Sequence, residues 1–175
     1  MSSLRASAAR TESADNAYVF EVVDGGPARD VTFINQSLSW HNAEKAGESG
    51  YRPLHIFVRD SKGAVVAGVL GTTYWGWLVL DIIWVDAKLR GHGYGRKLLR
   101  MAEAEAINRR CQHSYLDTFS FQGAMPFYKA EGYLTFGALE GFPTGHRRFF
   151  MKKDLVPRAP ADNTEVEARV VSEAR

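Results

Sequence analysis

A glycine-rich loop between an apolar strand and an amphipathic helix is the feature that most constrains this chain. An apolar stretch at residues 78–85 precedes the loop at residues 90–95, and apolar residues follow at helical spacing over residues 94–110. Glycine accepts positive φ and leaves room above the backbone, so the N–H groups of such a loop can converge on an anion. The loop therefore predicts a diphosphate site at the start of a helix.

The residues of the loop exclude two common nucleotide motifs. A Walker loop needs Lys followed by Ser or Thr after its second glycine, but Arg96 follows the last glycine here. A dinucleotide fingerprint needs Gly-x-Gly-x-x-Gly, whereas Gly91, Gly93 and Gly95 alternate. The pattern that fits is Arg/Gln-x-x-Gly-x-Gly/Ala, which Arg90, Gly93 and Gly95 satisfy.

This pattern is the acetyl-coenzyme A (acetyl-CoA) signature of the GNAT superfamily of N-acetyltransferases, and the chain resembles that family. Residues 126–133, with the sequence PFYKAEGY, resemble the aromatic, lysine and glycine motif that follows in such enzymes. Two motifs in family order are far more specific than one, and the resemblance covers about residues 18–155. It implies a three-layer α/β/α fold with a splayed central mixed β-sheet.

Periodicity along the chain predicts an α/β fold of the mixed-sheet (α+β) kind, with the element order β-α-β-β-β-α-β-α-β-β. The expected elements, in order, are a strand at 17–23, one or two helices within 28–48, strands at 55–59, 64–73 and 75–85, a helix at 94–110, a strand at 115–119, a short helix at 124–131, and strands at 133–139 and 147–153. The predicted domains are a flexible N-terminal segment (1–16), the N-acetyltransferase domain (17–155) and a polar C-terminal tail (156–175).

Composition narrows the class of protein. The 175 residues, 45% of them hydrophobic, suffice for one core, and a net charge of +2 offers no basic face for nucleic acid. The longest apolar stretch is too short for a membrane span, the first residues lack the apolar core that a signal peptide would have, and the single cysteine, Cys111, excludes an internal disulfide. The histidines lack metal-ligand spacing. We expect a cytoplasmic protein with no metal, no nucleic acid and no membrane partner.

The resemblance implies where the acetyl donor, acetyl-CoA, would bind. The strand before the loop would pair its backbone with the pantetheine amides, the loop amides would hold the diphosphate, and basic side chains would complement its charge. An alternative is that the basic residues form an ordinary solvated helix start. The cofactor-binding residues expected on this basis are Ile83, Trp84, Val85, Arg90, Gly91, His92, Gly93, Tyr94, Gly95, Arg96 and Lys97.

Two residues are expected to carry the chemistry. The resemblance places the family's catalytic tyrosine at Tyr128, whose phenol is protonated at neutral pH and could donate to the departing thiolate. Asp81 is the lone carboxylate in an apolar strand, where an unpartnered charge is costly, and it is the candidate base. The alternatives are a core tyrosine and a structural aspartate. The family's asparagine is replaced by Phe121, so Gln122 or Ser120 would have to take its contact.

The acceptor is expected to be a small-molecule amine, such as a metabolite, antibiotic or xenobiotic, because the chain carries no added recognition domain and is rich in aromatic residues. Trp40 and Tyr74 could wall its pocket, and His146 could reach it from a late loop. Two alternatives remain: a protein N-terminal or lysine acetyltransferase, and a non-catalytic acyl-CoA binding module. Relatives are often dimers, so a homodimer is also expected.

Overall fold

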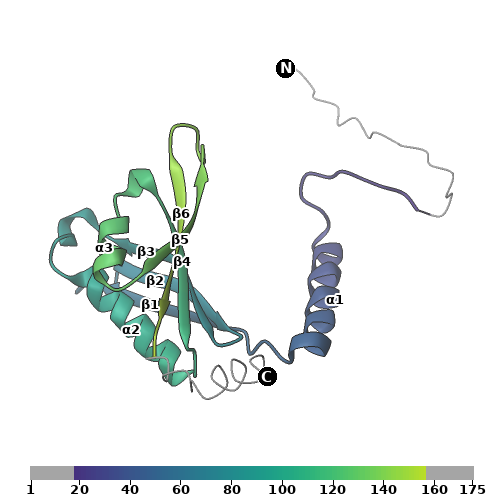
Figure 1. Ribbon diagram of the computed structural model, residues 1–175, viewed down its shortest axis with the longest axis horizontal. Helices are drawn as coiled ribbons and strands as arrows, with labels where there is room; N and C mark the ends of the chain where they lie inside the picture. Colours follow the sequence, from purple (N-terminus) through teal and green to yellow (C-terminus); the bar gives the residue numbers. More distant parts are fainter. Residues whose placement is uncertain (1–17, 157–175) are drawn as a thin grey trace, which may run out of the picture. The chain divides into compact units, whose positions relative to one another are not determined.

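The computed structural model describes residues 18–156, and the chain separates into two units, residues 1–48 and 49–175. The first unit contains α1 (Ala28–Ala46), and the second contains the β-sheet and the remaining helices (Figure 1). The predicted N-terminal segment (1–16) and the predicted C-terminal tail (156–175), apart from residue 156, lie outside the described residues. The prediction of helix within residues 28–48 is confirmed as a single helix, and none of its residues is buried.

The second unit is built on a six-stranded mixed sheet with the strand order β1-β2-β3-β4-β6-β5. Only β3 and β4 run parallel, and every other neighbouring pair is antiparallel. The predicted α/β class with a mixed sheet is therefore confirmed. The strands are β1 (Arg52–Arg59), β2 (Val65–Tyr74), β3 (Trp77–Val85), β4 (His113–Phe119), β5 (Leu134–Glu140) and β6 (Arg147–Asp154).

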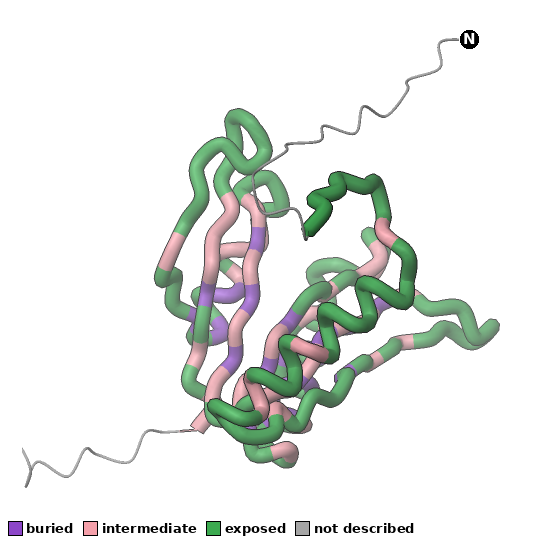
Figure 2. Tube along the Cα trace, turned by 90° about the vertical axis from the view of Figure 1, so that its right-hand side faces the viewer, coloured by how far each residue is buried: buried purple, intermediate pink, exposed green. Residues whose placement is uncertain are grey.

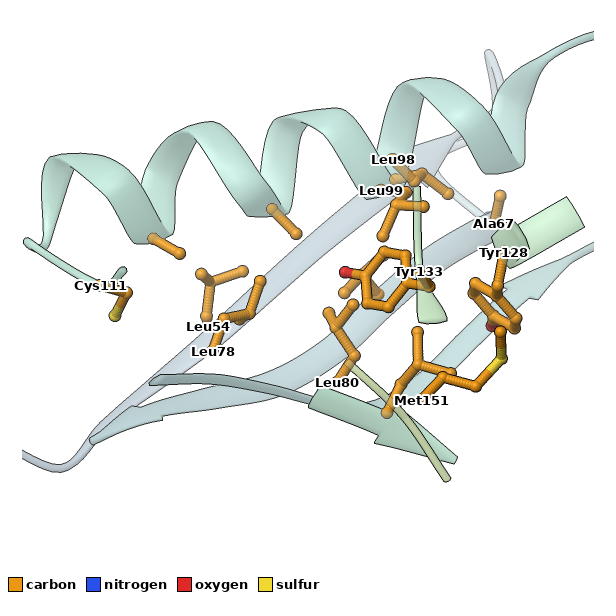
Figure 3. Packing of buried hydrophobic residues seen from close by; sticks show 14 residues of the cluster. Leu54, Ala67, Leu78, Leu80, Leu98, Leu99, Cys111, Tyr128, Tyr133 and Met151 are labelled. Atoms are coloured by element: carbon orange, nitrogen blue, oxygen red, sulfur yellow. The ribbon is translucent and has the colours of Figure 1, made fainter. Parts of the chain in front are cut away.

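One face of the sheet forms the core together with helix α2 (Tyr94–Asn108). Apolar residues three and four apart on α2, namely Leu98, Leu99, Ala102 and Ala106, are buried against the strands (Figure 3). Buried and partly exposed residues alternate along β2 and β4 (Figure 2), as expected for strands with one covered face. Short helix α3 (Met125–Ala130) adds Tyr128 to the same core.

The predicted first strand, residues 17–23, does not form. Residues 18–23 have no regular structure, and large side chains such as Tyr18, Phe20 and Val22 are exposed. The β-forming composition of this stretch was the basis of the prediction, but a strand is stable only when another strand pairs with its backbone. In the described part of the chain, β1 is paired on one side only, with β2.

Two short 3-10 helices complete the second unit, η1 (Ala87–Leu89) before the glycine loop and η2 (Ser120–Gln122) after β4. Both follow strands that end beside the candidate site. None of the helices within residues 18–156 is long and apolar enough to cross a membrane.

Candidate active site

Strands β3 and β4 part halfway along their length. Their parallel pairing ends at Leu80 opposite Leu116, although both strands continue to Val85 and Phe119. A β-bulge at the same level makes Asp81 the extra residue of β3, because Leu70 pairs with Ile82 and Gly71 pairs with Leu80. The bulge turns β3 away from β4, and a gap between two strands is the result.

A cleft of about 870 Å³ occupies this gap. It passes between the two faces of the sheet, since its lining includes Thr118, which faces the core, and Asp117, which faces the opposite side. Its walls come from β3, the glycine loop, the start of α2, the end of β4, η2 and α3. The two residues predicted to carry the chemistry, Asp81 and Tyr128, both line it.

The free edge of β3 presents backbone groups to the cleft. The N–H of Asp86 donates to the carbonyl of Val66 on the β2 side, at 2.9 Å. Because backbone groups of alternate residues point to opposite edges of a strand, those of Ile83 and Val85 point away from β2. The carbonyl of Val85 is already engaged, because it accepts a hydrogen bond from the Nε of Arg90 at 3.1 Å. The remaining groups are available to an extended amide-containing ligand.

The glycine loop ends in a helix start that is open to a ligand. Gly91 and Gly93 adopt φ of +78° and +80°, and a Cβ on either would meet no atom within 4 Å. The N–H of Lys97 makes the first intrahelical bond of α2, to Gly93. The N–H groups of Tyr94, Gly95 and Arg96 therefore have no intrahelical acceptor, and they add to the positive end of the helix dipole. This geometry fits a diphosphate.

The basic side chains of the loop divide between two roles. The guanidinium groups of Arg96 and Arg100 bind the buried carboxylate of Glu131, at 2.5 and 3.2 Å. Burial alone would raise the pKa of Glu131, but these two hydrogen bonds hold it below its usual value. The Arg96 side chain thus ties α2 to the end of α3. Lys97 lines two shallow hollows beside Gly93, where a further phosphate could lie, and His92 lines one of them.

Asp81 and Tyr128 have the protonation behaviour that their expected roles need. The pKa of Asp81 is raised by partial burial and by the negative charge of Asp117, and His55 partly offsets this. The pKa of Tyr128 is raised by burial and also by Asp117, so its hydroxyl is protonated at neutral pH. Within residues 18–156 the Tyr128 hydroxyl has no hydrogen-bond partner. Every fully buried side-chain polar atom in this part of the chain has one, so the Tyr128 hydroxyl is not fully buried. The hydroxyl is therefore open to the cleft.

The two expected acceptor residues of the second unit, Tyr74 and His146, do not gather in one place. Tyr74 belongs to a separate aromatic hollow of about 540 Å³. His146 lies in the turn between β5 and β6, where its ring contacts Phe121 and its Nδ1 lies 3.3 Å from the Ser120 hydroxyl, but it does not line the cleft. Trp40 is on α1 in the first unit and is exposed. The aromatic hollow is lined by Tyr74, Trp75, Trp77, Val79, Tyr115, Phe136 and Lys152.

Gln122 and Ser120 were both candidates for the contact of the missing family asparagine. The side-chain oxygen of Gln122 accepts from the Thr118 hydroxyl and from the backbone N–H of Phe119, both at 2.8 Å, and Gln122 lines the cleft. Ser120 instead accepts from the backbone N–H of Arg147 and does not line the cleft. Phe121 and Gln122 therefore line the cleft, and Gln122 is the one described lining residue with a side-chain amide.

Sequence reasoning missed an ion pair at the cleft. Asp117 on β4 accepts two hydrogen bonds from Arg148 on β6, at 2.7 and 2.6 Å. Asp117 is the one carboxylate of β4, but that strand also contains His113, Ser114 and Thr118, so Asp117 lacks the apolar setting that marked Asp81. Arg148 had no such signal, because it lies in a pair of arginines near a turn. Within residues 18–156, no three His, Cys, Asp or Glu side chains are grouped as metal ligands.

Comparisons with known proteins agree with this geometry. Residues 28–133 match the acetyltransferase (GNAT) family. An acetyltransferase of Agrobacterium fabrum is 33% identical over 134 residues, which cover 77% of this chain and 97% of the relative. A blasticidin-S acetyltransferase of Streptomyces morookaense is 34% identical over 108 residues, or 59% of this chain and 79% of the relative.

A solved structure shows the same fold. The crystal structure of an acetyltransferase from Bacillus cereus has a TM-score of 0.69 and 31% sequence identity, and the match covers 77% of this chain and 97% of that one. The family match includes the glycine loop, the helix after it and the residues up to Tyr133. This protein is therefore an enzyme of the acyltransferase class and belongs to the GNAT family of acetyltransferases.

Proposed function

We propose that this protein transfers the acetyl group of acetyl-CoA directly to the primary amine of a small molecule. The observation that carries the proposal is the cleft between β3 and β4, which joins the glycine loop at one end to Asp81 and Tyr128 within one continuous lining. The donor would lie along the free edge of β3, as an added strand, with its diphosphate on the N–H groups of α2. The amine would approach from the opposite face of the sheet.

The chemistry needs one base, one acid and close contact between the reactants. Asp81 would take a proton from the acceptor ammonium, which frees the nitrogen lone pair to attack the thioester carbonyl. The tetrahedral intermediate would then collapse, the carbon–sulfur bond would break, and Tyr128 would give its proton to the thiolate. The nitrogen would lose its second surplus proton, which would restore the Tyr128 hydroxyl, and Asp81 would release its proton to water. No acyl-enzyme is formed. Gln122 would supply the amide contact to the donor that the family asparagine makes.

Two observations favour a small acceptor over a protein. The aromatic hollow lies on the same sheet face as Asp117, since Tyr115 and Asp117 are two residues apart on β4, and an aromatic hollow suits a flat organic molecule. The Streptomyces relative is named for acetylation of blasticidin S, a small molecule. Tyr74 is the proposed acceptor contact in this hollow, and Trp40 and His146 remain proposed contacts.

The test is a thiol-release assay with acetyl-CoA and a panel of small amines, N-terminal peptides and lysine peptides. We expect thiol release with at least one small amine, and mass spectrometry should show one acetyl group on that amine. Faster release with peptides than with every small amine would favour the protein acetyltransferase. Coenzyme A binding without release for any acceptor would favour the non-catalytic module. Gel filtration tests the proposed homodimer, and cell fractionation tests the proposed cytoplasmic location.

Closing the donor slot at Gly95 should strongly weaken coenzyme A binding without unfolding the protein. A Cβ at this position would lie 3.9 Å from both Val85 and Phe127, which is ordinary contact, so Ala fits and a longer side chain must enter the cleft. We expect Gly95→Leu to weaken coenzyme A binding about 100-fold or more, which is about 2.7 kcal/mol. The matched control, Gly95→Ala, should bind within about tenfold of the wild type. Calorimetry measures both, and equal affinity of the two variants would contradict the proposed slot.

A further inference from the structure

Two carboxylates face the cleft at the point where its two strands part. The last paired residues of β3 and β4 are Leu80 and Leu116, and the next residue on each strand is an aspartate, Asp81 and Asp117. Both aspartates line the cleft with Tyr128. The proposed mechanism uses Asp81 and leaves Asp117 without a role, although Asp117 is the first residue of β4 beyond the last pair.

Asp117 is held in place more firmly than a surface carboxylate. The Nε and one terminal nitrogen of Arg148 each donate to a different oxygen of Asp117, at 2.7 and 2.6 Å, which is the planar two-bond arrangement that fixes orientation best. The Arg148 guanidinium in turn lies among three phenyl rings, with its central carbon 5.3 to 5.6 Å from the ring centres. We call these rings the Arg148 cage: Phe119, Phe142 and Phe150.

We propose that Asp117 is a positioning residue for acceptor deprotonation: Arg148 and its cage fix the Asp117 carboxylate in place on β4, next to the strand that carries Asp81, and its charge strengthens Asp81 as the base. This inference rests on the proposed function. In the step itself, an N–H bond of the ammonium breaks, an O–H bond forms on Asp81, and the freed lone pair attacks the thioester. Asp117 neither gains nor loses a proton.

The charges around Asp81 support this arrangement. Partial burial raises the pKa of Asp81 most, the charge of Asp117 raises it further, and His55 on β1 lowers it. Its neighbours on β2, Leu70 and Gly71, carry no charge. Arg148 is on β6, which lies on the side of β4 away from β3, and its positive charge is paired with Asp117. By Coulomb's law this charge acts on Asp81 with the opposite sign to that of Asp117. Tyr128 on α3 lines the same cleft as a neutral phenol.

The pH dependence follows from the sign of these charges. Asp81 accepts a proton only in its ionised form, so kcat/KM should rise with pH through the pKa of Asp81. We call this rise the acidic limb of the pH profile. Asp117→Asn removes a negative charge beside Asp81, so the acidic limb should move to lower pH, by about 0.5 to 1 unit. Arg148→Gln removes the opposing positive charge, so the limb should move to higher pH by a similar amount of about 0.5 unit.

Arg147 provides a matched control on the same strand. It adjoins Arg148, but its side chain pairs with Glu140 on β5 at 2.9 Å. Arg147→Gln makes the same change of charge, and the limb should stay where it is in the wild type. Opposite shifts in Asp117→Asn and Arg148→Gln, with none in Arg147→Gln, support the proposal. Shifts in the same direction, or no shift in folded variants, would overturn it.

A measurement that needs no catalysis separates this inference from the proposed function. Carbon-13 NMR of the Asp81 carboxyl group reports its titration directly, and Asp81→Asn assigns the signal. If no amine is acetylated, the proposed function fails, and the Asp81 titration still decides whether Asp117 and Arg148 act on it in opposite directions. Arg148→Lys keeps the charge and removes the planar fork. With that variant the limb should stay within about 0.3 unit of the wild type.

Discussion

Replacing Tyr128 by Phe should lower the turnover number for acetyl transfer about 100-fold to 1000-fold, which is about 2.7 to 4 kcal/mol of barrier. The hydroxyl opens on the cleft, and burial and Asp117 raise its pKa, so it holds a proton at neutral pH and can give it to the leaving thiolate. The ring itself stays, because Phe has the same shape in the core beside Phe127 and Tyr133. Steady-state thiol release at saturating acetyl-CoA and amine measures the effect.

The neighbouring tyrosine is the matched control for this prediction. Tyr133 is buried with its hydroxyl 2.8 Å from that of Ser114, and it does not line the cleft. Tyr133→Phe should lower the free energy of unfolding by about 1 kcal/mol and leave turnover unchanged. Coenzyme A affinity should be the same in Tyr128→Phe and the wild type. Full turnover in Tyr128→Phe would move the acid role to another group or to water.

Gly71→Ala should lower the free energy of unfolding by about 3 kcal/mol. A Cβ at Gly71 would lie 2.4 Å from the carbonyl oxygen of Val79 and 3.4 Å from the Cα of Leu80. These are backbone atoms that cannot rotate away, so β2 and β3 would have to separate at the bulge. Because the bulge positions Asp81, the folded fraction should also lose activity. Urea unfolding measures the stability change.

A second strand glycine provides the comparison. At Gly137 on β5 a Cβ would meet only a ring carbon of Phe150, at 3.7 Å, which is ordinary contact. Gly137→Ala should therefore change the free energy of unfolding by less than about 1 kcal/mol. If Gly71→Ala were as well tolerated as Gly137→Ala, the bulge would be more adaptable than the close backbone approach indicates. The placement of Asp81 would then have to depend on other contacts.

Local sequence pattern was enough to predict most of the helices and strands. Helix α2 was predicted because Leu98, Leu99, Ala102 and Ala106 recur at helical spacing, and those four side chains are buried against the sheet. Strands were predicted at residues 55–59 and 64–73, and between them Asp60-Ser61-Lys62-Gly63 has the composition of a turn that joins β1 and β2 as a hairpin. The Asp60 side chain there accepts from the backbone N–H groups of Lys62 and Ala64 at 2.9 Å. Such signals lie within a few residues of each other, so a sequence can reveal them.

The prediction of a first strand at residues 17–23 was wrong because a strand depends on a partner that local pattern does not reveal. Residues 18–23 have the composition of a strand, but composition does not supply the second strand that must accept and donate its hydrogen bonds. Arg96 shows the same limit at the site. Its place after the glycines suggested a phosphate ligand, while its side chain binds Glu131, 35 residues away in the chain. Contacts at that separation cannot be read from local pattern.

The amino-acid order by itself determined the class of fold and the glycine loop with its helix, since each depends on residue types at short spacing. It also marked Asp81 as a lone carboxylate in an apolar strand, whereas the resemblance to the GNAT superfamily pointed to Tyr128. The tertiary structure alone decided how far β3 and β4 separate, which arginines are engaged, and that Asp117 and Arg148 meet beside Asp81. These depend on a bulge and on strands brought together from distant parts of the chain. The physical reason is that charge and packing act through space, whereas a motif describes only neighbours along the backbone.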